Sequence, residues 1–154
     1  MNIFYLDKDP NKAARLQYNK HVVKMILESA QMLCTAHHET YPSDDIPYKK
    51  AHVNHPSTIW TRQSLQHYYW LYDHMMALGD EYTKRYNKIH KTQKVIHDLY
   101  EICNGDYAQM TDPPTCMPDE YKTDDYVQSY RNYYVGDKKR FARYTNRGTP
   151  EFMQ

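Results

Sequence analysis

Glycine is scarce in this chain, with only 4 glycines among 154 residues. Phosphate-binding loops and dinucleotide-binding folds need several glycines at fixed positions, because the backbone there approaches the phosphates closely. Four glycines therefore exclude both classes of nucleotide site. The chain also lacks a G-x-S-x-G segment, which excludes the nucleophile elbow of the α/β-hydrolases.

Cysteine and long apolar runs are scarce as well. The three cysteines, Cys34, Cys103 and Cys116, are odd in number, far apart, and form no CxxC pair, so we expect reduced thiols in a cytoplasmic protein. The apolar runs span only a few residues, which predicts no membrane-spanning segment. Residues 1–6 are followed at once by the charged residues 7–9, so we expect no secretory signal.

The chain has almost no net charge, at +1 with histidine neutral. No strong overall field therefore draws it to nucleic acid or to a membrane, although basic residues can still gather locally. Tyrosine is abundant instead, with 17 Tyr against 3 Phe, and the mean hydropathy is −0.98. Tyrosine in a core needs hydrogen-bond partners, whereas tyrosine on a surface is suited to stacking on bases, and both uses remain open.

Apolar residues recur at helical spacing along most of the chain. Asp9 is placed to cap a helix with Pro10 at its first position, and the pattern continues to about residue 38, with a possible break near residues 18–19. A second long helix is predicted from Ser57 or Thr58 onward.

Two further helices are predicted in the second half. One begins near Thr92, points Val95, Ile96, Leu99, Ile102 and Cys103 inward, and closes at Gly105; the other covers about 124–135 and stops at Gly136. Residues 39–57 and 106–122 are long loops that contain prolines. The sequence therefore predicts an all-α fold: a single compact domain over residues 1–154, with four to five helices and two long loops.

A polar stripe lies on the predicted helix over residues 19–28. The residues expected to face the core are Val23, Ile26 or Leu27, Ala30 and Leu33, and His21, Lys24 and Glu28 follow at three- and four-residue spacing beside them. A histidine, an amine and a carboxylate together can perform acid–base or amine chemistry. We therefore predict that His21, Lys24 and Glu28 are catalytic and line one cleft. The alternative is an ordinary helix edge with a Lys24–Glu28 salt bridge.

The nine histidines offer no recognised metal pattern, neither HExxH nor the zinc-deaminase signature. A composite site from His37 or His38, His52 or His55, and His67 is the alternative to scattered histidines. We expect scattered histidines and no metal.

The start of the second predicted helix is a candidate site for an anion. A helix N-terminus presents free N–H groups, and Arg62, one turn inside, can clamp a phosphate. His55 and Trp60 complete this candidate substrate-binding group, with Trp60 available to stack on a base. The alternative is a capped helix with Trp60 in the core.

The C-terminal third interleaves basic residues with tyrosines, a pattern that suits phosphate contacts combined with base stacking. The candidate substrate-binding residues there are Tyr130, Arg131, Lys138, Arg140 and Arg143, and Arg147 follows them. A solvated helix face is the alternative.

Three stretches together resemble small phage-encoded proteins: residues 19–25, His55-Pro56 with residues 60–62, and residues 130–134. The group that they resemble is the phage pyrimidine-dimer DNA glycosylase/lyase of the endonuclease V type. The resemblance implies a small, mainly helical domain that uses an amine to attack the deoxyribose C1′ of a damaged nucleotide, with a glutamate assisting. It also implies DNA as the partner, bound through arginines and lysines, and no metal or other cofactor.

Carried over by position, the family's carboxylate corresponds to Glu28. In that family the amine belongs to a small residue that is exposed when the initiator methionine is removed, whereas the bulk of Asn2 here disfavours that removal. The amine would then be Lys24 or an unusual terminus, and a lysine beside a carboxylate suits Schiff-base chemistry.

Two other functions remain open from the residues alone. One is a nucleotide hydrolase or transferase in which His21 and Glu28 act as acid and base and Arg62 binds phosphate. The other is a non-catalytic protein that binds a nucleotide or a host protein in a pocket built on the polar stripe.

Overall fold

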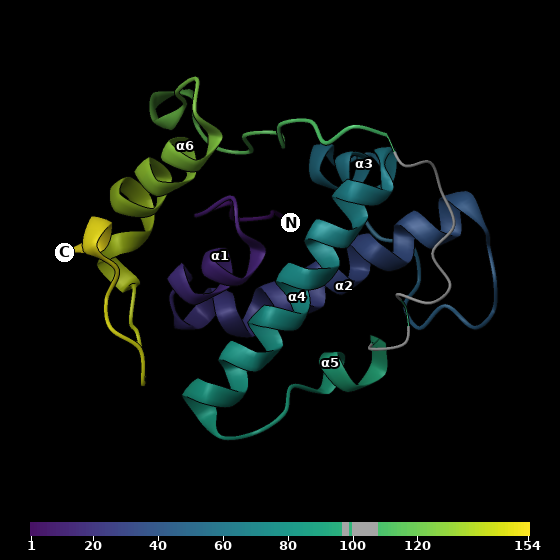
Figure 1. Cartoon of the computed structure of the whole chain (residues 1–154), viewed down its shortest axis with the longest axis horizontal. Helices are drawn as coiled ribbons and strands as arrows, with labels where there is room; N and C mark the ends of the chain where they lie inside the picture. Colours follow the sequence, from purple (N-terminus) through teal and green to yellow (C-terminus); the bar gives the residue numbers. More distant parts are fainter. Residues whose placement is uncertain (97–98, 100–107) are drawn as a thin grey trace.

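A computed structural model describes residues 1–96, 99 and 108–154, and these residues form six α-helices and no strand (Figure 1). The helices are α1 (Pro10–Leu16), α2 (Asn19–Thr40), α3 (Pro56–Gln63), α4 (Leu65–Tyr86), α5 (Lys91–Ile96) and α6 (Tyr126–Tyr133). The predicted all-α fold class is confirmed. No helix in the described part of the chain is both long enough and apolar enough to cross a membrane.

The helix boundaries follow local capping. Asp9 accepts hydrogen bonds from the backbone N–H groups of Asn11 and Lys12, as its predicted capping role requires. The break between α1 and α2 is confirmed, since Gln17 and Tyr18 are both extended. The second predicted helix is interrupted, because Ser64 adopts an extended conformation and caps α4 through its hydroxyl.

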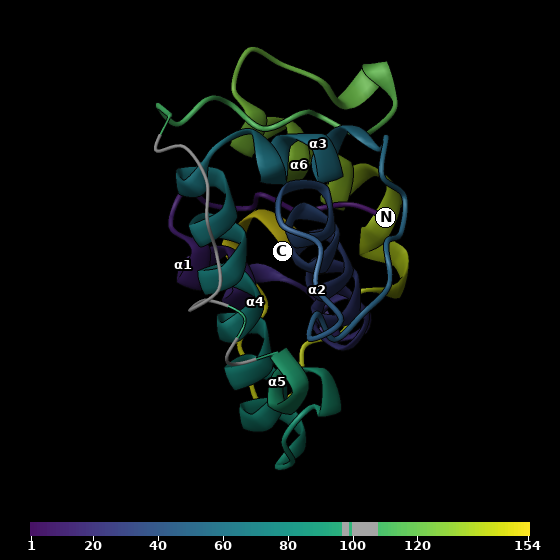
Figure 2. The same cartoon turned by 90° about the vertical axis from the view of Figure 1, so that its right-hand side faces the viewer.

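The two 22-residue helices, α2 and α4, pack against each other, and α1 and α3 pack on α4 (Figures 1 and 2). Two of the predicted inward positions were wrong, because Val23 and Val95 are 41% and 43% exposed. Of the alternatives Ile26 and Leu27, Ile26 is the buried one. The core face of α2 runs instead through Val22, Met25, Ile26, Ser29, Ala30 and Leu33, which keeps helical spacing but is rotated by about one residue.

The first six residues lie at the centre of the molecule rather than on a sheet edge. Ile3, Phe4, Tyr5 and Leu6 are all buried, so neighbouring side chains on both sides of the segment are covered. Figure 1 shows this segment between the α1–α4 helices and α6. The segment itself belongs to neither a helix nor a strand.

The predicted stop at Gly136 was wrong. After α6 the chain continues through a π-helical turn, Tyr134–Lys138, and a 3₁₀ turn, Lys139–Phe141. Gly136 is needed for close packing instead, because a Cβ atom there would collide with the Tyr121 ring. The predicted third helix is described only as far as Ile96, and Ile102, Cys103 and Gly105 lie outside the described residues.

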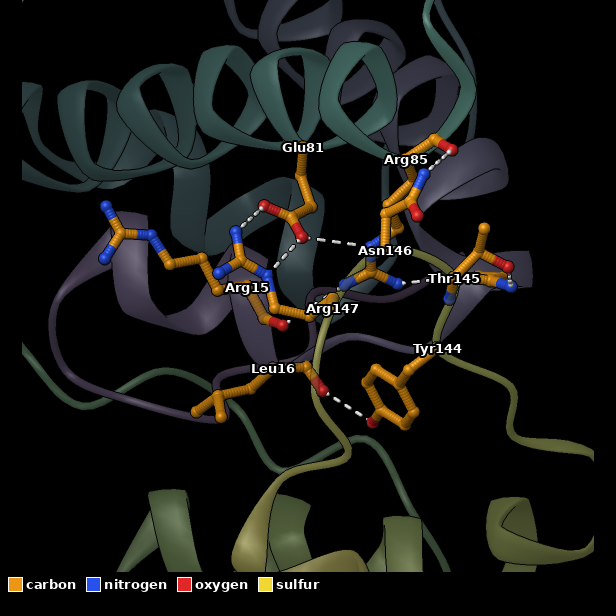
Figure 3. Close-up of polar contacts among 9 residues, drawn as sticks. Arg15, Leu16, Glu81, Arg85, Tyr144, Thr145, Asn146 and Arg147 are labelled. Atoms are coloured by element: carbon orange, nitrogen blue, oxygen red, sulfur yellow. Dashed lines mark hydrogen bonds and ion pairs between the residues drawn. The ribbon is translucent and has the colours of Figure 1, made fainter.

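Residues 142–149, here called the C-terminal strap, are fastened to α1, α2 and α4 (Figure 3). Arg147 donates two hydrogen bonds of 2.7 Å to Glu81, which also accepts one from Arg85. The Tyr144 hydroxyl donates to the Leu16 carbonyl at 2.7 Å. The strap thus closes over the junction between α1 and α2.

Replacing Arg147 with alanine should destabilise the protein by about 1.5–3 kcal/mol, because it removes two charge-assisted bonds from a buried carboxylate. The matched control is Arg143→Ala, since the Arg143 side chain is exposed and donates only to a neighbouring carbonyl. Urea unfolding of both variants measures the difference. Equal free energies of unfolding for the two variants would contradict the proposed fastening role.

Candidate active site

The carboxylate of Glu28 lies beside the N-terminal amine. The Met1 nitrogen is 3.5 Å from Glu28 Oε1, and the Glu28 side chain is 15% exposed. The other carboxylate oxygen, Oε2, is buried and has no hydrogen-bond partner among the described residues. An amine and a carboxylate therefore meet at the middle of α2, with one carboxylate oxygen still free to accept a hydrogen bond.

Hydrogen bonds from several elements fix the two residues that carry the amine. The Thr58 hydroxyl donates to the Met1 sulfur at 3.5 Å. Asn2 donates through Nδ2 to the Cys116 carbonyl at 2.9 Å, and its Oδ1 accepts from the Ile3 N–H. The start of the chain is thus held between α3 and the segment before α6.

Tyr130 and Arg131, both predicted to bind substrate, support this N-terminal segment from α6. Tyr130 is fully buried, and its hydroxyl lies 3.1 Å from Asn2 Oδ1. Arg131 donates to the Leu6 carbonyl at 2.9 Å and pairs with Asp7 at 3.6 Å. Both residues therefore contact the N-terminal segment, Tyr130 next to the amine at Asn2 and Arg131 at the far end of the segment.

His21 lies in an aromatic cluster with Phe4, Tyr18 and Tyr134, next to the N-terminal segment. Its ring stacks on Phe4 at 4.0 Å, and its two nitrogens contact the hydroxyls of Tyr18 at 3.0 Å and Tyr134 at 2.7 Å. Burial, with smaller contributions from Lys138 and Lys24, lowers the pKa of His21 to about 3. The ring is therefore neutral at pH 7 and both of its nitrogens are occupied.

The start of α3 is capped by its own residues. His55 Nδ1 accepts the Ser57 N–H at 3.1 Å, and Arg62 donates to the Val53 carbonyl at 2.7 Å. Trp60 is buried, where it stacks on His67 at 4.0 Å with an angle of 7° between the rings. Arg62 thus secures the loop that holds His55, and the Trp60 ring lies in the core. His55 is half-buried close to the amine and Glu28, and burial lowers its pKa.

Comparison with known proteins gives one family. The sequence model of the family described as pyrimidine dimer DNA glycosylase matches residues 1–94, which is more than half of the chain. The chain belongs to the pyrimidine dimer DNA glycosylase family. No curated protein and no solved structure matches it. The resemblance found from the sequence is confirmed, and membership supports a DNA-repair glycosylase and DNA as its partner.

The match of this glycosylase family covers the whole amine–carboxylate site. Residues 1–94 include Met1, Glu28 and Thr58, and also His21 with its partners Phe4 and Tyr18, whereas Tyr134 lies outside the match. Helical spacing could identify His21, Lys24 and Glu28 as neighbours along one side of a helix. It carried no signal for Met1, because the contact with Glu28 spans 27 residues and depends on the tertiary fold.

Basic residues lie along one exposed side of α2. Lys24 and Lys20 are exposed one and two turns before Glu28, and the Lys20 Nζ lies 5.6 Å from the centre of the Phe141 ring. Arg140, from the 3₁₀ turn Lys139–Phe141, lies over the same ring at 4.9 Å. The Phe141 ring therefore joins Lys20 of α2 and Arg140 in one basic surface. Lys138 pairs with Asp137 and lies over Tyr133, while Arg143 is exposed.

Histidines in the described residues are spread over separate contacts. His37 contacts the Tyr68 hydroxyl, His67 the Trp60 carbonyl, and His74 the Pro10 carbonyl. No group of three His, Cys, Asp or Glu side chains suited to a metal ion occurs in the part of the chain that the structure describes. Cys34 and Cys116 are free thiols, and Cys103 lies outside the described residues.

The buried neutral His21 predicts a specific loss of stability in acid. The unfolded side chain titrates near pH 6.5 and the folded one near 3, so between these values the unfolded state binds more protons. Stability should be fully present above pH 6.5 and fall by about 1.4 kcal/mol per pH unit below it. His37 and His74, whose pKa values burial lowers to about 4, add to the slope in the same direction.

The measurement is urea unfolding between pH 7 and pH 4 for the wild type and His21→Gln. The difference in free energy between the two proteins should shrink as the pH falls, because only the wild type has to keep His21 uncharged. A difference that is constant with pH would show that His21 is not held neutral.

Proposed function

We propose that this protein is a base-excision DNA glycosylase/lyase that acts on damaged pyrimidines, with the N-terminal amine as nucleophile and Glu28 as the assisting carboxylate. The contact of 3.5 Å between the Met1 nitrogen and Glu28 Oε1 carries the proposal. Membership of the pyrimidine dimer DNA glycosylase family supports it. Of the two amines that the sequence left open, the terminal one has the carboxylate contact, whereas Lys24 is exposed on the flank of α2.

The chemistry requires a neutral amine beside a group that can take its proton. Once Glu28 has accepted a proton from the ammonium, the nitrogen lone pair bonds to C1′ of the damaged nucleotide, the C1′–N bond to the base breaks, and the base leaves with the electron pair and gains a proton. The nitrogen then loses one of its two remaining protons, and opening of the C1′–O4′ bond, with the proton of Glu28 passed to O4′, gives a protonated imine (an iminium) and returns Glu28 to its ionised form.

Strand cleavage and release follow from the imine. Removal of a proton from C2′ expels the 3′ phosphate, and water then hydrolyses the C=N bond and returns the free amine. Glu28 Oε2 is buried and lacks a hydrogen-bond partner among the described residues, so a small movement of the side chain is required before it accepts a hydrogen bond from the sugar or from water. The carboxylate also offsets the positive charge that forms on the iminium nitrogen.

The nucleotide hydrolase alternative required His21 as an acid or base. Both ring nitrogens of His21 contact tyrosine hydroxyls, and burial keeps its pKa near 3. Such a ring is suited to holding Phe4, and with it the N-terminal segment, in place. We therefore assign His21 a positioning role.

DNA is proposed to lie along the basic flank of α2. Lys20, Lys24 and Glu28 are spaced by four residues, so they form a row along the helix with about 6 Å between neighbours. Arg140 and Arg143 extend this surface from the C-terminal segment. The row would place phosphates beside the carboxylate, and unstacking a damaged base costs only a few kcal/mol.

Borohydride trapping tests the proposal, because borohydride reduces an imine to a stable amine. The protein is incubated with a duplex that contains an ultraviolet-induced pyrimidine dimer or an abasic site, in the presence of borohydride and a chelator. A covalent protein–DNA adduct should form, and an undamaged duplex of the same sequence should give none. Absence of an adduct on both damaged duplexes would contradict the proposal, and binding or hydrolysis of a free nucleotide would then favour the alternatives.

A further inference from the structure

We infer that Met1 is retained in the active protein and supplies the reacting amine itself, so that the residue usually discarded becomes the catalytic residue. This inference rests on the proposed function and deepens it. The reacting amine is the α-nitrogen of Met1, and the Met1 side chain holds that nitrogen beside Glu28.

The Met1 side chain is built into the protein. It is 2% exposed, and its sulfur accepts the hydrogen bond from Thr58, which is itself fully buried. The residue as a whole is nevertheless half-buried, so the accessible part is its backbone end. This is the arrangement that a nucleophile at a chain end requires, with an anchored side chain and an accessible amine.

Removing Met1 would place the new terminal amine one residue further along the chain, where consecutive Cα atoms are about 3.8 Å apart. The segment cannot slide back to restore the contact with Glu28. The Asn2 side chain is held by the Cys116 carbonyl, the Ile3 N–H and the Tyr130 hydroxyl. Ile3 and the three residues after it are buried, and a shift by one residue would exchange every side-chain position.

Removal would also leave an apolar cavity where the Met1 side chain lies and would deprive the Thr58 hydroxyl of its sulfur partner. Asn2 serves retention in two ways. Its bulk disfavours removal of Met1, and its side-chain hydrogen bonds set the position of the peptide bond that follows the amine.

The test compares one variant in two forms. Asn2→Ala has a small second residue, so it is obtained with Met1 removed when methionine aminopeptidase is active and with Met1 retained when that enzyme is inhibited. Adduct formation with an abasic duplex and borohydride is measured for both forms, with circular dichroism as the control for folding. The form that retains Met1 should react at least about 100-fold faster, because a displaced nucleophile loses its alignment.

Wild-type protein supplies the second measurement, which does not depend on the variant. Its intact mass should include Met1, and the peptide that carries the reduced sugar should begin with Met1. Equal or faster reaction of the trimmed form, or a sugar on Asn2 of a trimmed wild-type chain, would overturn this inference and leave the proposed function standing. Absence of any adduct with wild-type protein would overturn the proposed function and this inference together.

Discussion

Glu28→Gln should bind damaged DNA as tightly as the wild type and turn it over about 10²–10⁴-fold more slowly. Glutamine has almost the same shape, so it fits beside the Met1 amine, but it can neither accept the amine proton nor offset the charge on the iminium nitrogen. Single-turnover cleavage of an abasic duplex measures the rate, and a mobility shift measures binding.

The matched control lies on the same helix. Glu39→Gln removes another carboxylate of α2, one that pairs with Lys50 at 2.8 Å and takes no part in the site. Its cleavage rate should stay within about twofold of the wild type, since exposed salt bridges contribute little to stability. Equal rates for Glu28→Gln and Glu39→Gln would remove Glu28 from the mechanism.

Blocking the terminal amine should abolish adduct formation altogether. An acyl group on the amine removes the nucleophilic lone pair, so no imine can form, whatever the affinity for DNA. Lys24→Ala should still form the adduct at saturating DNA, with weaker binding because one proposed phosphate contact is lost. The reverse pattern, an adduct that survives blocking of the terminus and disappears in Lys24→Ala, would assign the reaction to the lysine.

Local signals predicted much of the fold. The Asp9-Pro10 start of α1, the break near Tyr18 and the all-helical class follow from capping chemistry and apolar spacing. Features that depend on distant partners could not be predicted in this way. Nothing in the sequence near Gly136 shows that Tyr121 packs against it, or that the chain continues through a π-helical turn where a stop was expected.

The candidate site likewise has features that the sequence predicted and features that depend on distant partners. Periodicity identified Glu28 and His21 because both lie on one helix. The role of each residue depends on a partner that is far away in sequence. The Tyr134 hydroxyl contacts one nitrogen of His21, and the Met1 amine contacts the Glu28 carboxylate. Buried Tyr130 and Tyr134 use their hydroxyls to fix Asn2 and His21, whereas the buried Tyr5 hydroxyl has no hydrogen-bond partner among the described residues.

The site of the trapped sugar tests the central claim most directly. Wild-type protein is reduced with borohydride on an abasic duplex and digested, and tandem mass spectrometry identifies the residue that carries the sugar. The amine–carboxylate contact of 3.5 Å predicts that the sugar is on the α-nitrogen at the N-terminus. A sugar on the side chain of Lys24 or of any other lysine would contradict it.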